Sequence, residues 1–93
     1  MSTTIDNSEA AILGRTINPE RGDLSREAAE SILRLRLSER DTRRLDHLSD
    51  KAQDGSLSVD EESELESYRH VGRLLELLKS KARLSIKRAS GGG

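Results

Sequence analysis

Residues 58–88 read SVDEESELESYRHVGRLLELLKSKARLSIKR, and this stretch decides the fold. Its leucines and other apolar side chains recur at helical spacing and reach nearly every side of one helix. A helix that is apolar on several sides must be covered on several sides. The stretch therefore predicts one long helix, over residues 59–87, that needs cover from the rest of the chain or from a partner.

The apolar residues of this long helix fall on two faces. One set lies within about 80° of Leu75 at a step of ~100° per residue, and we expect it to form the intramolecular seam, with Gly72 allowing a close helix approach. The set comprises Leu65, Tyr68, Val71, Gly72, Leu75, Leu78, Ala82 and Ile86. Leu77 and Leu84 lie almost opposite. A single antiparallel helix cannot reach both faces, so the strip of Leu77 and Leu84 is predicted to be open to a partner.

Capping signals place a shorter helix before the long one. Ser58 with Glu61 forms a capping box, in which the serine oxygen accepts from the amide of Glu61 and the glutamate reaches back. Gly55 is suited to end the preceding helix, because glycine adopts the left-handed conformation without steric cost. Ser38 with Asp41 is a variant of the same box at its start, and the helix carries Leu45, Leu48 and Ala52 on one stripe. The sequence thus predicts an antiparallel hairpin of two helices, over residues 39–54 and 59–87.

Two short helices are expected nearer the N-terminus. Ser8 is a suitable N-cap for a helix over residues 9–13 that ends near Gly14. Ser25 is a suitable N-cap for a helix over residues 25–37. If this second helix continues the shorter hairpin helix through a kink, it covers part of the overhanging half of the long helix.

These signals together predict an all-α protein: an antiparallel helical hairpin with a long C-terminal helix and one or two short N-terminal helices. The 93 residues allow one domain, residues 1–93, and the polar or Gly-rich residues 1–7 and 89–93 are expected to be disordered. No apolar run approaches the roughly 20 residues that a membrane span needs. No basic region followed by an apolar one opens the chain. We therefore expect a cytoplasmic protein.

Charge is balanced overall but segregated along the chain. Residues 1–68 carry nine Lys and Arg against sixteen Asp and Glu, a net charge of −7, and residues 69–93 carry seven against one, a net charge of +6. Acidic residues at the start of the long helix and basic residues at its end match the helix dipole, which explains much of the segregation. The basic end is also a candidate surface for an acidic protein or for nucleic acid.

The sequence offers little material for catalysis or for metal binding. It contains no cysteine, which excludes a thiolate metal site. His47 and His70 are the only histidines, whereas a metal site needs three or four ligands brought together. No paired catalytic carboxylates, nucleophile elbow or phosphate loop is present. We expect a protein that is not an enzyme and that holds no metal or cofactor.

The favoured hypothesis is a small protein-interaction module. The contact surface would combine the uncovered strip with the basic end of the long helix, and it would comprise Leu74, Leu77, Leu84, Lys81, Arg83 and Arg88. Self-association as a homodimer, through a coiled coil, is an alternative use of the same apolar surface. Both hypotheses make the C-terminal half of the long helix the place where a partner binds.

Another alternative rests on residues 33–37, which alternate Leu and Arg with period two and remain open between helix and strand. Such a segment followed by two helices resembles ribbon-helix-helix repressors and antitoxins. In that family a dimer lays paired strands in the major groove of DNA. The resemblance therefore implies base contacts by Arg34 and Arg36, with Leu35 and Leu37 in the dimer core.

A further resemblance covers most of the chain. The segments that carry it are Met1–Ile5, Ala28–Leu33, the Gly55–Ser58 turn, Val71–Leu75 and Lys79–Arg83. They look like a group of short bacterial helical proteins that are often encoded beside an HNH endonuclease. The resemblance implies an antitoxin-like or accessory partner of such a nuclease and assigns no residue role. Where that group commonly starts a helix with Thr-Pro-Glu-Glu, this chain has Ser-Val-Asp-Glu, which keeps the capping chemistry.

Overall fold

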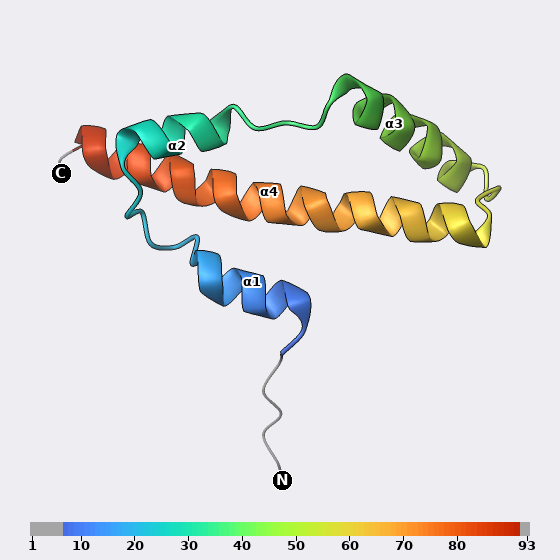
Figure 1. The fold of residues 1–93 in the computed structure, drawn as a ribbon, viewed down its shortest axis with the longest axis horizontal. Helices are drawn as coiled ribbons and strands as arrows, with labels where there is room; N and C mark the ends of the chain where they lie inside the picture. Colours follow the sequence, from blue (N-terminus) through green and yellow to red (C-terminus); the bar gives the residue numbers. More distant parts are fainter. Residues whose placement is uncertain (1–6, 92–93) are drawn as a thin grey trace, which may run out of the picture. The chain divides into compact units, whose positions relative to one another are not determined.

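The computed structural model describes residues 7–91, which form four helices and no strand. The helices are α1 (Glu9–Ile17), α2 (Arg26–Leu33), α3 (Glu39–Gln53) and α4 (Val59–Gly91) (Figure 1). The predicted all-α class, with a long C-terminal helix and shorter helices before it, is confirmed. None of these four helices is long and apolar enough to cross a membrane.

The long helix extends further toward the C-terminus than the sequence predicts. Of the residues expected to be disordered, residues 1–6 and 92–93 lie outside the described part. Ala89, Ser90 and Gly91 continue α4 beyond its predicted end at residue 87. Asn7 accepts a hydrogen bond from Nη2 of Arg15 at 3.2 Å. These three residues thus belong to α4, and the expectation of disorder at the two ends stays a prediction.

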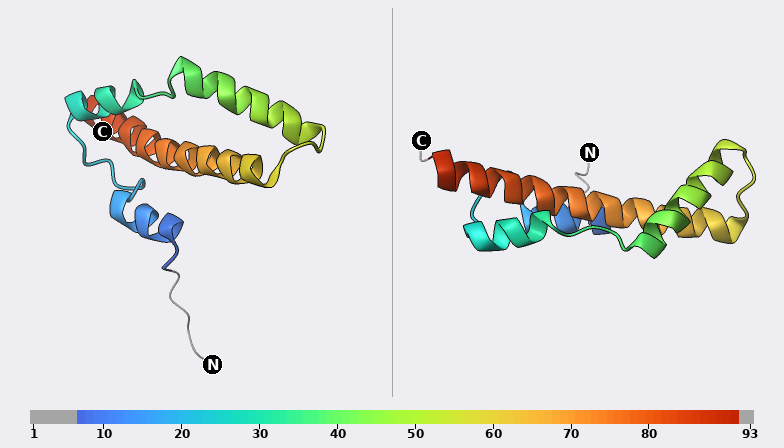
Figure 2. Two further views of the ribbon diagram at one scale, coloured as in Figure 1. Left: turned by 45° about the vertical axis from the view of Figure 1, so that its right-hand side comes forward. Right: turned by 90° about the horizontal axis from the view of Figure 1, so that it is seen from above.

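The chain is organised into two compact units, and each has its own packing. The hairpin unit comprises Arg36–Arg73, and the terminal unit comprises the residues up to Leu35 together with those from Leu74 onward. α3 and the first half of α4 build the hairpin unit (Figure 1). α1, α2 and the second half of α4 build the terminal unit (Figure 2). The long helix thus supplies one packing surface to each unit.

Caps on both helices close the turn of the hairpin unit. α3 is followed by Gly55 at φ 66°, and its amide donates to the carbonyl of Ala52 at 3.1 Å. At the start of α4 the amide of Glu61 donates to Ser58 Oγ at 3.1 Å, and the amide of Ser58 donates to Glu61 Oε1 at 3.0 Å. The predicted roles of Gly55 and of the Ser58 capping box are confirmed.

The two helices of the hairpin unit pack through a narrow apolar seam. Leu48 of α3 has 0% of its surface exposed and Leu65 of α4 has 4%. Leu45, Ala52 and Tyr68 are half-buried. The stripe of Leu45, Leu48 and Ala52 is the face that helical spacing predicts for this helix, and Leu48 is its buried centre.

Ion pairs between α3 and α4 accompany this seam. Arg44 donates from Nε and Nη2 to the two carboxylate oxygens of Glu64 at 2.6 and 2.8 Å. Lys51 Nζ lies 2.8 Å from both carboxylate oxygens of Glu61. The Lys51 ammonium and the Ser58 amide lower the pKa of Glu61 to about 2, and the Arg44 guanidinium lowers the pKa of Glu64. Both carboxylates are therefore held in their charged form.

These lowered pKa values predict a loss of stability in acid. A carboxylate whose pKa is lower in the folded than in the unfolded chain stabilises the fold above its unfolded pKa, and that contribution is lost as the pH falls toward the folded pKa. For Glu61 this window runs from the ordinary value of 4.5 down to about 2. The melting temperature, followed by circular dichroism, should fall as the pH is lowered through this window.

Glu61→Gln provides the control for this pH dependence. The amide cannot titrate, so the variant should melt at a lower temperature than the wild type at neutral pH but lose less between pH 4.5 and pH 2, the interval set by the two pKa values of Glu61. An acid-induced drop of the same size in both proteins would show that the Lys51–Glu61 pair does not carry the effect.

In the terminal unit, α2 packs against the second half of α4 through small side chains. Ala29 of α2 and Ala82 of α4 are fully buried, and Ser85 has 2% of its surface exposed. Ser85 Oγ accepts a hydrogen bond from the amide of Leu24 at 3.1 Å and donates to the carbonyl of Lys81 at 2.8 Å. Figure 2 shows α2 alongside the last turns of α4. The predicted cover of the long helix by the helix after Ser25 is therefore found.

The end of α1 differs from the prediction. The helix does not end near Gly14 but continues to Ile17. Asn18 then takes the left-handed conformation at φ 50°, and its amide donates to the carbonyl of Gly14 at 2.9 Å. Asparagine tolerates this conformation, and Pro19 disfavours a helical conformation in the residue before it. The Asn-Pro pair, not the glycine, ends the helix.

The end of α2 also differs from the prediction. The helix stops at Leu33 instead of residue 37, and residues 35–38 form a connection that is neither helix nor strand. Ser38 adopts the extended N-cap conformation at φ −62° and ψ 160°, and its side chain accepts from the amide of Asp41. An extended cap interrupts any continuous helix through this point. The Asp41 carboxylate accepts from the Ser38 hydroxyl at 3.1 Å, so its return contact is to the side chain of Ser38 and differs from the carboxylate-to-amide bond of the Ser58 box.

The predicted packing role of Gly72 is wrong. Gly72 is exposed, and a Cβ added to it would meet no heavy atom within 4 Å. Its neighbour Val71 keeps 43% of its surface exposed. The other predicted seam residues are buried or half-buried: Leu65, Tyr68, Leu75, Leu78, Ala82 and Ile86. The buried residues of α4 are Leu65 in the hairpin unit and Ala82 and Ser85 in the terminal unit. The predicted seam is therefore interrupted at the exposed Val71 and Gly72.

Candidate partner-binding site

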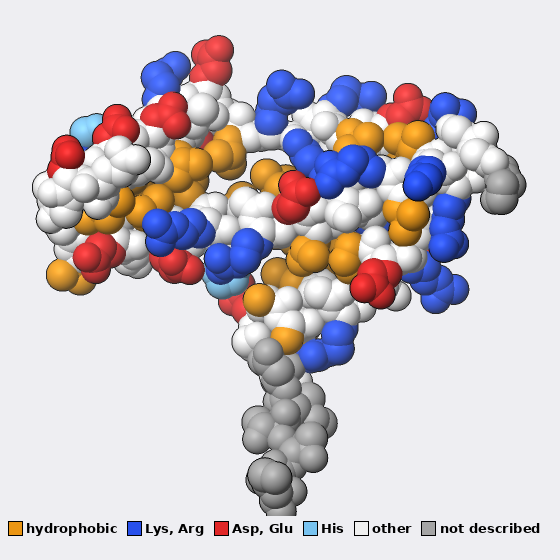
Figure 3. All heavy atoms as spheres, turned by 180° about the vertical axis from the view of Figure 1, so that it is seen from behind, with side chains coloured by type: hydrophobic (Ala, Val, Ile, Leu, Met, Phe, Trp, Pro, Cys, Tyr) orange, Lys and Arg blue, Asp and Glu red, His pale blue; other side chains and the backbone are white. Residues whose placement is uncertain are grey.

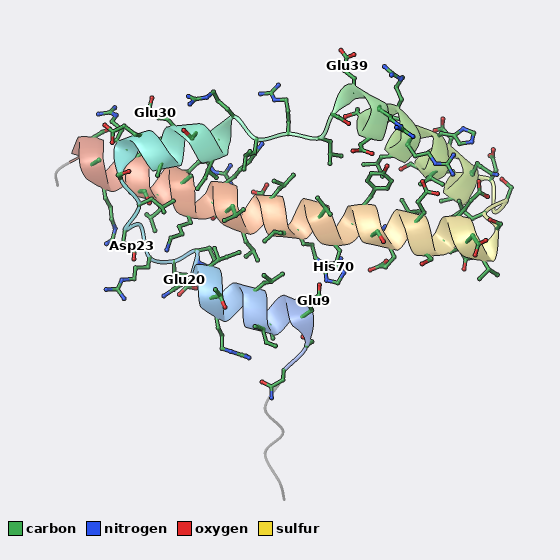
Figure 4. All side chains as sticks on the ribbon, viewed as in Figure 1. Glu9, Glu20, Asp23, Glu30, Glu39 and His70 are labelled. Carbon is green, nitrogen blue, oxygen red and sulfur yellow. The ribbon has the colours of Figure 1, made fainter. Side chains whose placement is uncertain are left out.

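Four of the six predicted contact residues of α4 form one stripe within the terminal unit. Leu77, Lys81, Leu84 and Arg88 are separated by four, three and four residues, so they lie on one side of the helix. The connection between α1 and α2 reaches this side. Lys81 Nζ lies 2.7 Å from Oδ1 of Asp23, which belongs to that connection (Figure 4). The stripe is therefore partly engaged by the chain itself.

Leu84 is covered by this connection at very short range. A Cβ built on Gly22 would lie 2.9 Å from Leu84 Cγ and 3.0 Å from the backbone carbon and oxygen of Leu84. Leu74 and Leu77 are half-buried, as is Leu84. The strip that helical spacing leaves to a partner thus receives part of its cover from residues 18–24.

Much of the positive charge on this half of α4 is paired. The side chain of Lys81 is only 12% exposed, and its ion pair lowers the pKa of the Asp23 carboxyl. Arg83 Nη2 lies 2.7 Å from Glu76 Oε1 in a pair that is largely exposed on both sides. Exposed pairs of this kind contribute little to stability, so Arg83 can exchange its partner at small cost.

Two cations at the end of α4 have no such partner. Lys87 and Arg88 are exposed, and neither makes a hydrogen bond or ion pair with any other residue between 7 and 91. Figure 3 shows Lys and Arg side chains gathered where α4 ends. Of the predicted contact cations, Arg88 is therefore the one whose charge is fully available to a partner.

A hollow of about 320 Å³ opens at the same place. Its lining residues are Leu84, Lys87, Arg88 and Gly91. Their spacing of i, i+3, i+4 and i+7 places them on one face of α4. The hollow thus joins an apolar side chain to two unpaired cations. Lys87 and Gly91 were missed by the sequence prediction, although their spacing from Leu84 was the signal that could have found them.

The two residues predicted to contact nucleic acid belong to different units. Arg34 caps α2 in the terminal unit, and its Nη2 donates to Ser31 Oγ at 3.2 Å. Arg36 is exposed in the hairpin unit and has no partner within the described chain. Residues 7–91 contain no strand that would present the two side chains as the ribbon-helix-helix resemblance implies.

The hairpin unit contains a second hollow, of about 680 Å³, which the sequence did not predict. Its lining residues are Ser38, Arg40, Asp41, Arg43, Arg44, Glu64 and Tyr68. The Tyr68 hydroxyl donates to Asp41 Oδ1 at 2.7 Å, and this hydrogen bond raises the pKa of Tyr68. The three arginines share one face of α3 by their i, i+3 and i+4 spacing. That spacing is the signal in the sequence that points to this hollow.

The histidines do not assemble a metal site in the part of the chain that the structure describes. No group of three His, Asp or Glu side chains there is close enough to hold a metal ion. His47 is exposed on α3, and His70 is half-buried on α4. The histidines therefore give no candidate metal site among residues 7–91.

Comparisons with protein-family models, with curated proteins and with solved structures give no match for this chain. The likeness to proteins encoded beside an HNH endonuclease and the likeness to ribbon-helix-helix proteins stay predictions.

Proposed function

We propose that this protein is a small non-enzymatic interaction module that binds an acidic segment of a partner protein at the end of α4. The observation that carries the proposal is the hollow in which Leu84 lies beside the unpaired Lys87 and Arg88. A partner segment with an apolar side chain between carboxylates matches both features. The apolar contact would supply burial, and the charges would supply orientation and a faster association.

Lys87 and Arg88 are chosen because the cations of α4 differ in the ion pairs that they must break when a partner carboxylate binds. Lys81 would have to leave its half-buried pair with Asp23, at 2.7 Å. Lys87 and Arg88 break no interaction when they meet a carboxylate, because they have none within residues 7–91. Arg83 is intermediate, since its exposed pair with Glu76 is weak. The order of importance is thus Lys87 and Arg88 first, then Arg83.

The identity of the partner is proposed from the resemblance alone. On that resemblance the partner is an HNH endonuclease encoded beside this protein, and this protein is its antitoxin-like or accessory subunit. The expectation is that the two proteins co-purify when they are expressed together.

The double variant Lys87→Gln/Arg88→Gln tests the contact surface. It removes both unpaired cations from exposed positions, so the fold is expected to remain intact. Affinity for the co-expressed neighbour should fall by about tenfold or more, since two charge-assisted contacts are lost. Binding of the wild type should weaken with added salt and that of the variant should depend on salt less. Titration calorimetry after co-purification measures both. Leu84→Asp is a poorer test, because Leu84 packs against Gly22.

Arg40→Gln/Arg43→Gln is the matched control, since it removes the same charge from the hairpin unit. It should leave the affinity unchanged. If both double variants weaken binding equally, net charge and not this hollow drives the interaction. If neither does, the proposed surface is wrong. A concentration-dependent mass of the protein alone in sedimentation, lost in Lys87→Gln/Arg88→Gln, would instead make the partner a second copy.

A further inference from the structure

The hollow of the hairpin unit carries positive charge that the fold does not use. Three arginines line it, together with Asp41 and Glu64. Each of the two carboxylates already accepts hydrogen bonds from other side chains that line the hollow. Asp41 accepts from the Tyr68 hydroxyl at 2.7 Å and from the Ser38 hydroxyl at 3.1 Å. Glu64 accepts from Arg44 at 2.6 and 2.8 Å.

The arginines, by contrast, have most of their N–H donors without an acceptor within residues 7–91. Arg40 is exposed and has no hydrogen bond or ion pair within residues 7–91. Arg43 has a single loose pair, 3.8 Å from Glu39, and the two side chains are 73% and 93% exposed. Figure 4 shows Glu39 pointing outward at the start of α3. Arg44 uses Nε and one N–H of Nη2 for Glu64, which leaves three of the five guanidinium donors.

The arrangement suits one kind of ligand. Arg40 and Arg43 stand one turn apart on the same face of α3. Guanidinium groups match the tetrahedral oxygens of phosphate through paired N–H donors, and they remain charged at every physiological pH. The three arginines repel a cationic ligand, and an apolar ligand would leave their free N–H donors without acceptors. A small anion with several acceptor oxygens is the ligand that satisfies the free donors.

We propose that Arg40 and Arg43, with the free edge of Arg44, form a binding site for a phosphate group in the hollow of the hairpin unit. The site is independent of the partner surface at the end of α4, because the two use different residues in different units. The phosphate belongs either to inorganic phosphate or to a phosphate monoester, which share the same tetrahedral dianion. Tyr68, the only aromatic residue of the chain, lines the hollow and reports on its occupancy.

The test is a titration of the full chain with inorganic phosphate at constant ionic strength, with chloride as the compensating anion. Nuclear magnetic resonance follows the side-chain N–H groups of Arg40 and Arg43, and tyrosine fluorescence follows Tyr68. We expect saturable shifts of the arginine signals and a fluorescence change with the same dissociation constant. A parallel titration with adenosine monophosphate separates the sources: tighter binding assigns the site to phosphate monoesters, and equal or weaker binding assigns it to free phosphate.

Two variants with equal loss of charge decide whether the site is specific. Arg40→Gln/Arg43→Gln should weaken phosphate binding by at least tenfold, while Lys87→Gln/Arg88→Gln should leave it unchanged. Circular dichroism checks that both variants keep the helical content of the wild type. Shifts that grow linearly with phosphate, or that fall equally in both variants, would overturn the proposal. Since the same two variants have the opposite expected effect on partner binding, either proposal can fail without the other.

Discussion

Leu48→Ala is expected to lower the free energy of unfolding of the hairpin unit by about 2–5 kcal/mol. Leu48 has 0% of its surface exposed and is the only residue of α3 that is fully buried. Its truncation opens a cavity in the seam between α3 and α4, and the other residues of α3 in the seam are half-buried side chains and ion pairs, which cannot fill the space. A small unit has a thin margin of stability. The variant should therefore unfold the hairpin at moderate concentrations of urea.

The measurement is a urea titration followed by tyrosine fluorescence, because the only tyrosine, Tyr68, lies in the hairpin unit. Val59→Ala is the matched control: it also shortens an aliphatic side chain, but Val59 is 82% exposed. Its effect should lie within about 0.5 kcal/mol of zero, as for other surface positions. If Leu48→Ala changes the midpoint no more than Val59→Ala does, the seam around Leu48 is not what holds α3 to α4.

The parts of the fold that the sequence predicts correctly are those governed by neighbouring residues. Ser8 accepts from the amide of Ala11 and Ser25 from that of Ala28, as expected of N-caps. A capping bond depends on the side chain and on an amide three residues later, so it can be inferred from the local sequence. Helical spacing likewise predicts that Leu48 is buried, since the face of a short helix is set by its own periodicity.

The parts that the sequence does not predict depend on contacts between distant residues. Asp23 and Lys81 form an ion pair, and the amide of Leu24 bonds to Ser85, 61 residues away. Gly22 has the appearance of a simple chain breaker in the sequence, yet its role is to pass over Leu84. Because nothing local signals this crossing, the spacing of α4 alone predicts that the strip around Leu84 is uncovered. The structure narrows the open surface to the residues beyond Leu84.

The same distinction applies to the candidate sites. Arg88 was predicted as a contact residue from the charge at the end of the long helix, and it lines the terminal hollow. The hairpin hollow needs α3 and α4 together, with Asp41 and Tyr68 joined over a separation of 27 residues. The sequence shows the spacing of the arginines on α3, but it does not show whether Arg40 and Arg44 have partners. Only the assembled hairpin shows that Glu64 occupies Arg44 and leaves Arg40 free.

Gly22→Ala is expected to destabilise the terminal unit by about 1–3 kcal/mol. Its Cβ would lie 2.9 Å from Leu84 Cγ and 3.0 Å from the backbone carbon and oxygen of Leu84. The side chain of Leu84 can turn away, but the backbone of α4 is fixed by its helical hydrogen bonds. The connection must therefore lift from the helix, which weakens the Lys81–Asp23 pair. Hydrogen exchange should become faster at the amide of Leu24, whose bond to Ser85 depends on this crossing.

Gly72→Ala separates this steric effect from the general effect of replacing glycine. Gly72 lies in the interior of α4, and a Cβ there would meet no heavy atom within 4 Å. Alanine should therefore stabilise the helix by about 0.5–1 kcal/mol, because glycine loses more backbone freedom on folding. Gly22 is not in the left-handed region, since Gly55 is the described glycine with positive φ, so its cost comes from contact with Leu84. The melting temperature should rise in Gly72→Ala and fall in Gly22→Ala. A stabilising Gly22→Ala would mean that the connection does not press against α4 in solution.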